Sequence, residues 1–336
     1  MPVVRSDRCL LHEPLAEIWV GVSTPAAETP ARMRVILDAL DARFVEAEPH
    51  PDEALLDVHD GELVAYLAGA WEEWNAIDLP QEQVVPYVFA HRELGARRVP
   101  TAVWARPGWF AYDTMTLVGP GTWEAARAAA DAALTAVDLV AGGEPLAYAC
   151  TRPPGHHVTR SAYGGSCYLN NAAIAASALQ RKLDGPVAVL DIDAHHGNGT
   201  QEIFRGRDDV RTGSVHVDPG AGWFPHFLGF ADESDDANRN VPLAPRSGDE
   251  LWLGAIEELV SWARGAGGLV VALGVDAAAG DPESPLEVSA AGFREAGKLL
   301  GGLGVPTVVV QEGGYDLGTL GVLVGEVLLG LEEGRP

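Results

Sequence analysis

The sequence predicts a single α/β domain built on a parallel sheet, and three observations lead to this prediction. Beyond residue 140, short apolar runs alternate with segments of helical length and periodicity, the pattern of a parallel sheet covered by helices. No linker-like stretch divides residues 1–336, so we expect one domain. Several apolar runs end directly in polar, titratable residues, as expected for a site at the carboxyl ends of parallel strands.

The first part of the chain is a mixed lead-in. Residues 32–42 have the periodicity of an amphipathic helix, and residues 52–74 that of two short helices. Residues 79–121 then break the pattern with five prolines and several aromatic side chains. A long irregular segment inside a domain is usually functional or part of an interface. An alanine-rich helix is expected over residues 123–140.

The second part carries the predicted sheet. Strands are expected near residues 146–150, 187–190, 212–217, 269–273 and 307–310. Helices are expected near residues 171–183, 249–264 and 289–303, and a polar loop over residues 232–240. Because helices separate these strands, the strands run parallel and their carboxyl ends share one edge of the sheet.

Composition and charge narrow the possible partners and location. The net charge of −25 makes the chain a poor phosphate binder, so no nucleic-acid partner is expected. Three dispersed cysteines without a C-x-x-C pair indicate a reducing compartment, and the N-terminus shows no apolar signal region. No apolar run approaches about 18 residues. We therefore expect a cytoplasmic protein without a membrane partner.

The stretch 187–201 is the motif on which the prediction of a metal depends. It begins as an apolar strand and runs directly into Asp191, Asp193 and His195. These side chains share one side of an extended chain, because the strand repeat is two residues. Such a group is costly unless a cation pairs it, and Asp with His suits zinc or another divalent transition ion. The alternative is that these residues and the adjacent His196 only cap the next helix, although few caps need four titratable groups.

Polar chemistry also follows three other predicted strands. The stretches are residues 151–157 (T-R-P-P-G-H-H), 274–283 (G-V-D-A-A-A-G-D-P-E) and 311–316 (Q-E-G-G-Y-D). Any one of them alone is more often a turn, but together they indicate a catalytic site. Asp193, His195 and Asp276 supply three ligands and leave positions open for water and a carbonyl oxygen, as in catalytic metal sites.

The remaining polar residues suit acid–base chemistry. His156 and His157 change charge near neutral pH, so one can take a proton from water and the other can protonate a leaving amine. Asp191 is placed to orient one imidazole, and Tyr315 offers a hydroxyl to a developing oxyanion. No Ser/His/Asp or Cys/His nucleophile pattern is present. The residues therefore predict a metal-dependent hydrolase.

Several motifs, taken together, resemble the histone deacetylase superfamily. They are R-P-P-G-H-H (152–157), D-I-D-A-H-H-G-N-G-T-Q (191–201), residues 274–282 and E-G-G-Y (312–315). Three more resemble its bacterial acetylpolyamine amidohydrolase branch: S-V-H-V-D-P (214–219), F-P-H-F-L-G-F-A-D-E (224–233) and G-P-G-T-W-E-A-A (119–126). The resemblance implies an arginase/deacetylase-type fold, with a central eight-stranded parallel sheet and helices on both faces. It also implies zinc-dependent hydrolysis of N-acetyl amides. Ligands of these types accept iron(II) as well as zinc, so iron(II) is an alternative metal.

The resemblance assigns roles to individual residues. The implied ligands of one zinc ion are Asp193, His195 and Asp276. The implied catalytic residues are the base His156, its partner Asp191, the second histidine His157, the neighbouring Asn198 and the oxyanion donor Tyr315. Asn198 stands where some relatives have Asp, and an amide favours a protonated histidine less. Potassium is expected at Asp191, Asp193, His195, Ser214 and Val215, and at a second site formed by Phe204, Arg207 and Val210.

The departures from the family pattern concern the substrate. An acetyl tunnel walled by two aromatic residues is usual, and here Phe224 matches one of them while Ser166, after Gly165, replaces the other. The tunnel should therefore be wider or more polar on that side. Trp104 and Met115 stand where the acetylpolyamine branch has carboxylates, which weakens the prediction of a polyamine substrate.

Two carboxylates at the expected tunnel rim instead support a cationic, polyamine-like substrate. Glu283 follows Asp-Pro at the rim and would favour a cationic substrate. Asp113 matches a rim aspartate that grips substrate amides in some deacetylases. Both residues are equally compatible with a solvated charge.

The expected function is removal of acetyl groups from N-acetylated amines, with acetylpolyamines first and acetyl-lysine or another acetylated small molecule as alternatives. An arginase-like ureohydrolase would need a second bridging carboxylate where Gly197 stands. A catalytically inactive binding module would lack one of the metal ligands or Tyr315, and all of these residues are present. We expect a small-molecule substrate and a homodimer built around residues 79–121, through Trp104, Trp109 and Phe110 as exposed aromatic residues.

Overall fold

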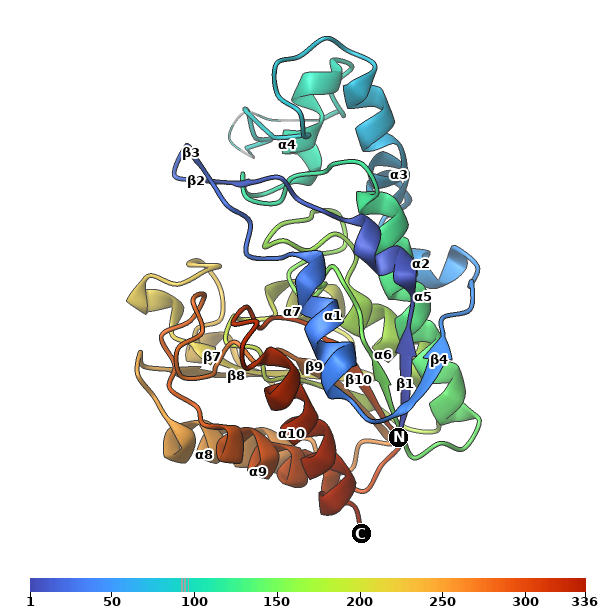
Figure 1. Ribbon diagram of the computed structural model, residues 1–336, viewed down its shortest axis with the longest axis vertical. Coiled ribbons are helices and arrows are strands. Elements are labelled where there is room, and N and C mark those ends of the chain that lie inside the picture. Colours follow the sequence, from blue (N-terminus) through green and yellow to red (C-terminus); the bar gives the residue numbers. More distant parts are fainter. Residues whose placement is uncertain (92, 94, 96) are drawn as a thin grey trace.

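The computed structural model describes residues 1–91, 93, 95 and 97–336, and an eight-stranded sheet runs through its centre (Figure 1). Every neighbouring pair of strands in this sheet is parallel, which confirms the expected fold class. The strand order is β4 (Arg43–Glu46), β1 (Pro2–Arg5), β5 (Leu146–Ala149), β10 (Thr307–Gln311), β9 (Gly268–Leu273), β6 (Val187–Asp191), β7 (Val210–Val217) and β8 (Asn238–Leu243).

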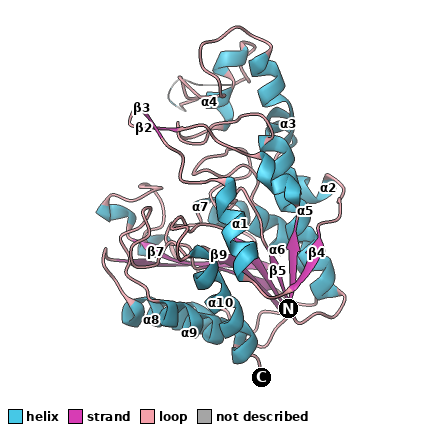
Figure 2. Ribbon diagram, viewed as in Figure 1, coloured by secondary structure: helices cyan, strands magenta, loops and turns pink. Residues whose placement is uncertain are grey.

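Helices cover both faces of the sheet (Figure 2). In β6, Val187 and Val189 face one core, whereas Ala188 and Leu190 face the other, as the two-residue repeat requires. The first core is covered by α2 (Glu53–Leu56), α3 (Gly61–Asn75), α5 (Thr122–Ala141), α6 (Asn171–Lys182) and α7 (Asn198–Phe204). The second is covered by α1 (Pro30–Ala39), α8 (Asp249–Trp262), α9 (Ala290–Gly301) and α10 (Leu320–Gly334). Burial on both faces explains why the central strands are continuous apolar runs.

The register of the four central strands brings their carboxyl ends level. Asp191 of β6 pairs with Ala272 of β9, and Leu273 of β9 pairs with Gln311 of β10. Val310 of β10 in turn pairs with Ala149 of β5. The residues that follow these strands therefore leave the sheet at one edge, where the polar motifs come together.

Some elements differ from the sequence-based expectation. Residues 232–240 were expected to be a polar loop, but the edge strand β8 begins at Asn238. Its polar side chains suit an edge position, where Asn238 accepts a hydrogen bond from the Thr212 hydroxyl of β7. The short strands β1 and β4 and the hairpin of β2 (Glu17–Trp19) and β3 (Val22–Thr24) lie within the lead-in, where no strand was expected.

Residues 79–121 are largely irregular, with a 3₁₀ turn at Val103–Ala105 and the short helix α4 (Pro107–Phe110). The expectation that Phe110 is exposed is wrong, because its ring is buried and stacks on Tyr66 with centroids 4.4 Å apart. Trp109 is also partly buried against the core, whereas Trp104 is 48% exposed. Among the described residues, no helix is both long and apolar enough to cross a membrane.

Candidate active site

The predicted site residues meet at the carboxyl edge of the four central strands. The histidine pair follows β5, the Asp-x-Asp-x-His motif closes β6, Asp276 follows β9 and Tyr315 follows β10. Asp193 and Asp276 are almost completely buried, with 1% and 0% exposure. The sequence pattern therefore located these residues correctly in space, although they come from distant parts of the chain.

Asp193, His195 and Asp276 form the candidate metal-binding group. One ligand atom from each lies within 4.8 Å of the others. The Nδ1 atom of His195 lies 3.2 Å from Oδ1 of Asp193 and 3.0 Å from Oδ2 of Asp276. Backbone N–H groups orient both carboxylates, since Gly313 donates to Asp193 and Ala194 donates to Asp276, each at 2.7 Å.

The electrostatics of this group favour a bound cation. Burial, and then the neighbouring charge of Asp193, raise the pKa of Asp276 to about 7. Two buried carboxylates that share one imidazole are costly unless a positive charge is present. Oxygen and imidazole donors at this spacing suit a divalent transition ion, so the residues fit the metal that the sequence implied.

The two histidines predicted to be catalytic, His156 and His157, have different partners. His156 Nδ1 lies 2.8 Å from Asp191, and His157 Nδ1 lies 2.7 Å from the side-chain oxygen of Asn198, so each ring donates through Nδ1. Burial lowers the pKa of His156, but Asp191 and then Asp193 outweigh burial and raise it to about 10. Burial and the neighbouring histidine charges instead hold the pKa of His157 well below its usual value.

Arg32 of α1 is a site residue that sequence reasoning missed. Its guanidinium donates to the carbonyl oxygens of Gly314 at 2.6 Å and Glu312 at 2.5 Å, and lies 4.7 Å from the ring centre of Tyr315. Its buried charge is paired with Glu28 at 3.0 Å. Arg32 therefore fixes the Gly-Gly-Tyr turn, and nothing in the local sequence of a helical arginine signals this.

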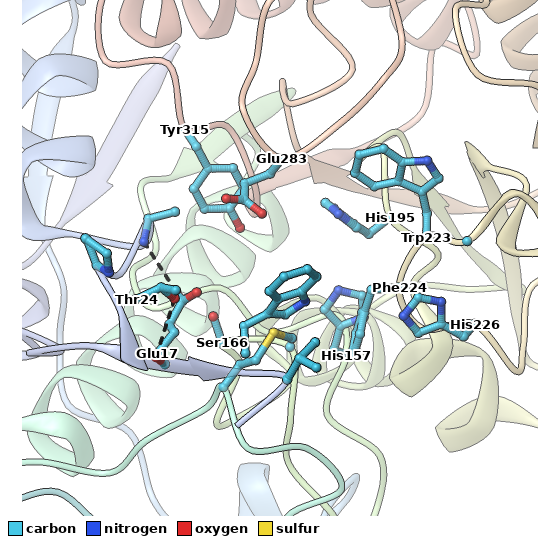
Figure 3. Close-up of a pocket in the computed structure, with 17 residues that line it drawn as sticks. Glu17, Thr24, His157, Ser166, His195, Trp223, Phe224, His226, Glu283 and Tyr315 are labelled. Carbon is cyan, nitrogen blue, oxygen red and sulfur yellow. Dashed lines mark hydrogen bonds between the residues drawn. The ribbon is translucent and has the colours of Figure 1, made fainter. Parts of the chain in front are cut away.

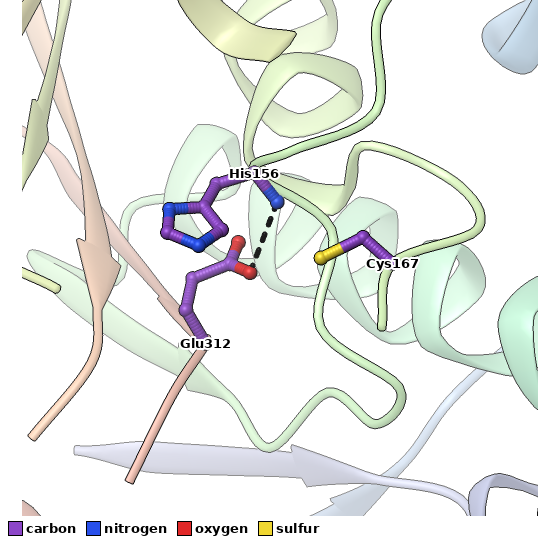
Figure 4. A group of neighbouring side chains, drawn as sticks. All are labelled: His156, Cys167 and Glu312. Atoms are coloured by element: carbon purple, nitrogen blue, oxygen red, sulfur yellow. Dashed lines mark hydrogen bonds between the residues drawn. The ribbon is translucent and has the colours of Figure 1, made fainter. Parts of the chain in front are cut away.

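Glu312 ties the tyrosine turn to the histidine pair (Figure 4). Its carboxylate accepts hydrogen bonds from the backbone N–H groups of Gly155 at 2.6 Å and His156 at 3.1 Å. His156, Cys167 and Glu312 also lie close enough to hold an ion. However, His156 Nδ1 and one Glu312 oxygen are already bonded, and burial raises the pKa of the Cys167 thiol well above its usual value. We therefore interpret this group as a structural clasp.

A cavity of about 730 Å³ opens onto these residues (Figure 3). The predicted residues that line it are His157, Gly165, Ser166, His195, Phe224, Glu283 and Tyr315. Phe224 packs edge-on against the ring of His157 with centroids 4.8 Å apart. Gly165 has φ +61°, and a Cβ atom there would lie 2.3 Å from His157, so glycine is required for this close wall.

Three rim predictions have different outcomes. Met115 lines the cavity, whereas Trp104 is not among its lining residues. The Asp113 carboxylate is occupied by the backbone N–H groups of Met115, Thr116 and Gly165, at 2.9, 2.9 and 2.6 Å. This carboxylate supports the cavity wall through the backbone of Gly165. Direct hydrogen bonding of Asp113 to the substrate stays a prediction.

The hairpin β2–β3 supplies rim residues that the sequence did not reveal. Glu17, Trp19 and Val20 line the cavity, and Figure 3 shows Glu17 next to Ser166. Burial, and then the charge of Glu283, raise the pKa of Glu17 to about 7. Two carboxylates, those of Glu17 and Glu283, therefore line the same cavity.

Comparisons with known proteins agree with this geometry. Residues 26–331 match the family described as the histone deacetylase domain. The chain belongs to the histone deacetylase family. It is 37% identical to acetylpolyamine amidohydrolase 1 of Pseudomonas aeruginosa, over 98% of each chain. It is 36% identical to acetylpolyamine amidohydrolase of Mycoplana ramosa, over 98% of this chain and 99% of that one.

A solved structure extends the comparison to the fold. The crystal structure of acetylpolyamine aminohydrolase from Burkholderia pseudomallei matches with a TM-score of 0.94 at 34% identity, over 100% of both chains. The chain is therefore an amide-hydrolysing enzyme of a metal-dependent family. An arginase-like second metal is also disfavoured by packing, because a Cβ atom on Gly197 would lie 2.2 Å from Asp191.

We expect one transition metal ion per chain, because the buried Asp193, His195 and Asp276 group needs one cation and Gly197 leaves no bridging carboxylate. Elemental analysis after dialysis should give a metal-to-chain ratio near one, and chelation should abolish activity. Asp276→Asn should lose the metal, whereas Asp113→Asn should keep it. Two tightly held transition ions, or full activity without metal, would contradict this expectation.

Proposed function

We propose that this enzyme removes acetyl groups from N-acetylated amines, with acetylated polyamines as the preferred class. The observation that carries the proposal is the pair of carboxylates, Glu17 and Glu283, in the cavity that contains His157, His195 and Tyr315. A cationic amine beyond the acetamide is the chemistry that such a pair attracts. The names of the similar bacterial amidohydrolases support the same class. Acetyl-lysine and other acetylated small molecules are the alternatives.

In this proposal Asp193, His195 and Asp276 would hold a zinc ion, or iron(II), which supplies Lewis-acid polarisation of the acetyl carbonyl and of a water when bound. The chain's own residues then manage protons and charge. Asp191 holds Nδ1–H of His156, so Nε2 is the atom free to take the proton of the attacking water. Neutralisation of Asp193 by a bound cation would lower the pKa of His156 toward the range of a working base.

Tyr315 and the histidines complete the proposed reaction. Burial keeps the pKa of Tyr315 well above its usual value, so the phenol retains its proton and can donate it as a hydrogen bond to the developing oxyanion. Collapse of the tetrahedral intermediate that carries this oxyanion breaks the amide C–N bond and needs a proton on the leaving nitrogen. His157 is neutral beside Asn198, so the proton available is the one that His156 has taken. The products are acetate and the free amine.

We further propose that potassium supports this edge of the sheet. Ser214 donates its hydroxyl to His216 at 2.8 Å, which leaves its oxygen lone pairs for a cation beside Asp191. Val215, Asp193 and His195 would contribute the remaining oxygens. The second proposed site, at Phe204, Arg207 and Val210, lies in a turn in which the N–H of Arg207 donates to the carbonyl of Phe204.

We also propose that one deacetylase domain spans residues 1–336, that the enzyme is cytoplasmic and that it forms homodimers through residues 79–121. The support for the dimer is a set of exposed apolar side chains on this segment, including Tyr87 at 71% and Trp104 at 48% exposure. The cavity mouth adds Trp19 at 62%. Exposed apolar patches of this kind mark protein contacts.

A dimer should be seen by light scattering at micromolar concentration. Trp104→Asp with Tyr87→Asp should shift the population toward monomer, because charge at an apolar contact is unfavourable. Phe44→Asp on the edge strand β4 is the matched control, since it changes an exposed aromatic residue elsewhere. A wild-type monomer at that concentration would refute the dimer.

Tyr315→Phe should lower turnover by roughly 10²–10³-fold with little change in substrate binding, because one oxyanion donor is lost. Steady-state kinetics with acetylputrescine would separate kcat from KM. Tyr87→Phe, which removes an exposed hydroxyl, should be neutral. Unchanged turnover in Tyr315→Phe would show that another group stabilises the oxyanion.

Glu283→Leu should reduce the preference for cationic over neutral acetamides. A wet rim pair contributes only about 0–1 kcal/mol, but two carboxylates in a narrow cavity act at lower effective dielectric. The preference should also weaken as salt rises. The test is the ratio of kcat/KM for acetylputrescine to that for N-butylacetamide. An unchanged ratio, or a parent enzyme that already prefers the neutral compound, would remove the polyamine assignment and leave only deacetylation.

The same ratio should depend on pH through Glu17. Its pKa is raised to about 7, so its carboxylate gains charge as the pH rises through 7. The free ammonium of the substrate stays protonated in that range, since alkylamines ionise near roughly 10. Cationic preference should therefore increase from pH 6 to pH 8 in the parent enzyme, and Glu17→Gln should flatten the change. A flat profile in the parent would argue against a role for Glu17.

A further inference from the structure

A segment of residues 219–234, here called the wall segment, provides Trp223, Phe224 and His226 to the cavity. It contains no strand or α-helix, only 3₁₀ turns at Pro219–Ala221 and Ala231–Glu233. Where its backbone N–H groups donate to backbone carbonyls, the acceptor is only two or three residues earlier in the chain. Phe227 at its tip is 85% exposed, so burial does not hold the tip. Its position must therefore be fixed by contacts from outside.

Glu233, near the end of the wall segment, makes one such contact and also bonds the segment internally. One oxygen of its carboxylate accepts hydrogen bonds from the backbone N–H groups of Gly229 at 2.9 Å and Phe230 at 3.0 Å. The other oxygen accepts from the side-chain amide of Gln201 on α7 at 2.8 Å. Glu233 therefore closes the wall segment on itself and fastens it to the helix that follows the metal-binding motif.

The amide of Gln201 has only one workable orientation. Its oxygen lies 2.9 Å from Nε2 of His196, 3.0 Å from the amide nitrogen of Asn238 and 2.9 Å from that of Asn240. With three donors around the oxygen, the –NH₂ group must face Glu233. The donors and acceptors of this network are therefore fixed. The –NH₂ group of Gln201 donates to the Glu233 carboxylate, and the oxygen of Gln201 accepts from His196, Asn238 and Asn240.

The network also reaches the metal-binding strand end. His196 follows the metal ligand His195, and its ring lies 4.6 Å from that of His216. His216 donates through Nε2 to the carbonyl of Gly229 at 2.7 Å. Gly229 has φ +100°, and a Cβ atom there would lie 2.8 Å from both histidine rings, so the wall segment is pressed against them.

We propose that Glu233 and Gln201 are positioning residues that hold the wall segment at a fixed distance from the metal-binding motif. The Phe224 ring then stays 4.8 Å from His157 and sets the width of the cavity beside the acetyl group. The inference rests on the proposed deacetylation only where it concerns acyl size. Neither residue contacts the cavity, so both act through the wall.

The polarity of the pair allows a reciprocal test. Glu233→Gln turns an –NH₂ toward the –NH₂ of Gln201, and Gln201→Glu sets two carboxylates face to face. The double variant Glu233→Gln/Gln201→Glu restores one donor and one acceptor with unchanged net charge. Asp232→Asn is the matched control, because it removes a neighbouring carboxylate that is exposed.

Hydrogen exchange of the wall segment in the full-length, metal-loaded enzyme gives a readout that needs no substrate. Both single variants should exchange faster in residues 222–230, and the double variant should return toward the parent rate. In parallel, each single variant should lower the kcat/KM ratio of acetylputrescine to butyrylputrescine about tenfold, a typical coupling between contacting residues. The double variant should recover most of this loss, and Asp232→Asn should show neither effect.

Two results would overturn the inference. One is a double variant no better than the single variants. The other is single variants that change only thermal stability, with wall exchange and acyl preference as in the parent. If no acetylated amine is hydrolysed at all, the proposed function fails, while the exchange data still decide whether the pair holds the wall.

Discussion

The structure depends on how two buried carboxylates are neutralised at the carboxyl edge of its sheet. Asp193 and Asp276 approach the same nitrogen of His195 at 3.2 and 3.0 Å, in a place where they are almost completely removed from water. A divalent cation bound between them would neutralise both carboxylates. The level ends of four parallel strands make this concentration of charge possible.

The surrounding residues hold the groups proposed to be catalytic in place beside that centre. Glu312 joins the end of β10 to the histidine turn through two backbone N–H groups, while Arg32 holds the carbonyls of the tyrosine turn. Arg32 is itself paired with Glu28 inside the protein. The proposed acid–base groups, oxyanion donor and metal ligands are thus parts of one connected structure. Small displacements at its periphery would therefore reach the proposed reacting centre.

The sequence was sufficient for the centre and insufficient for the shell. Asp191, Asp193 and His195 lie close together along one strand, so a two-residue repeat places them without knowledge of the fold. His156, Asp276 and Tyr315 follow apolar runs, and parallel topology brings such ends together. Arg32 and Glu17 escaped prediction because the site residues near them are distant in sequence. The β2–β3 hairpin also escaped prediction, although residues 17–24 (E-I-W-V-G-V-S-T) place β-branched and aromatic residues on both sides of a glycine. Phe110 was placed on the surface because proline-rich composition does not reveal that its ring stacks on Tyr66.

We infer that the catalytic metal is held by Asp193, His195 and Asp276. The other candidate group is the clasp of His156, Cys167 and Glu312. X-ray absorption at the zinc edge of the zinc-loaded enzyme distinguishes the two groups directly. We expect one zinc absorber with only oxygen and nitrogen neighbours at about 2.0–2.2 Å. A sulfur shell at about 2.3 Å would instead place the ion on Cys167 and contradict this assignment.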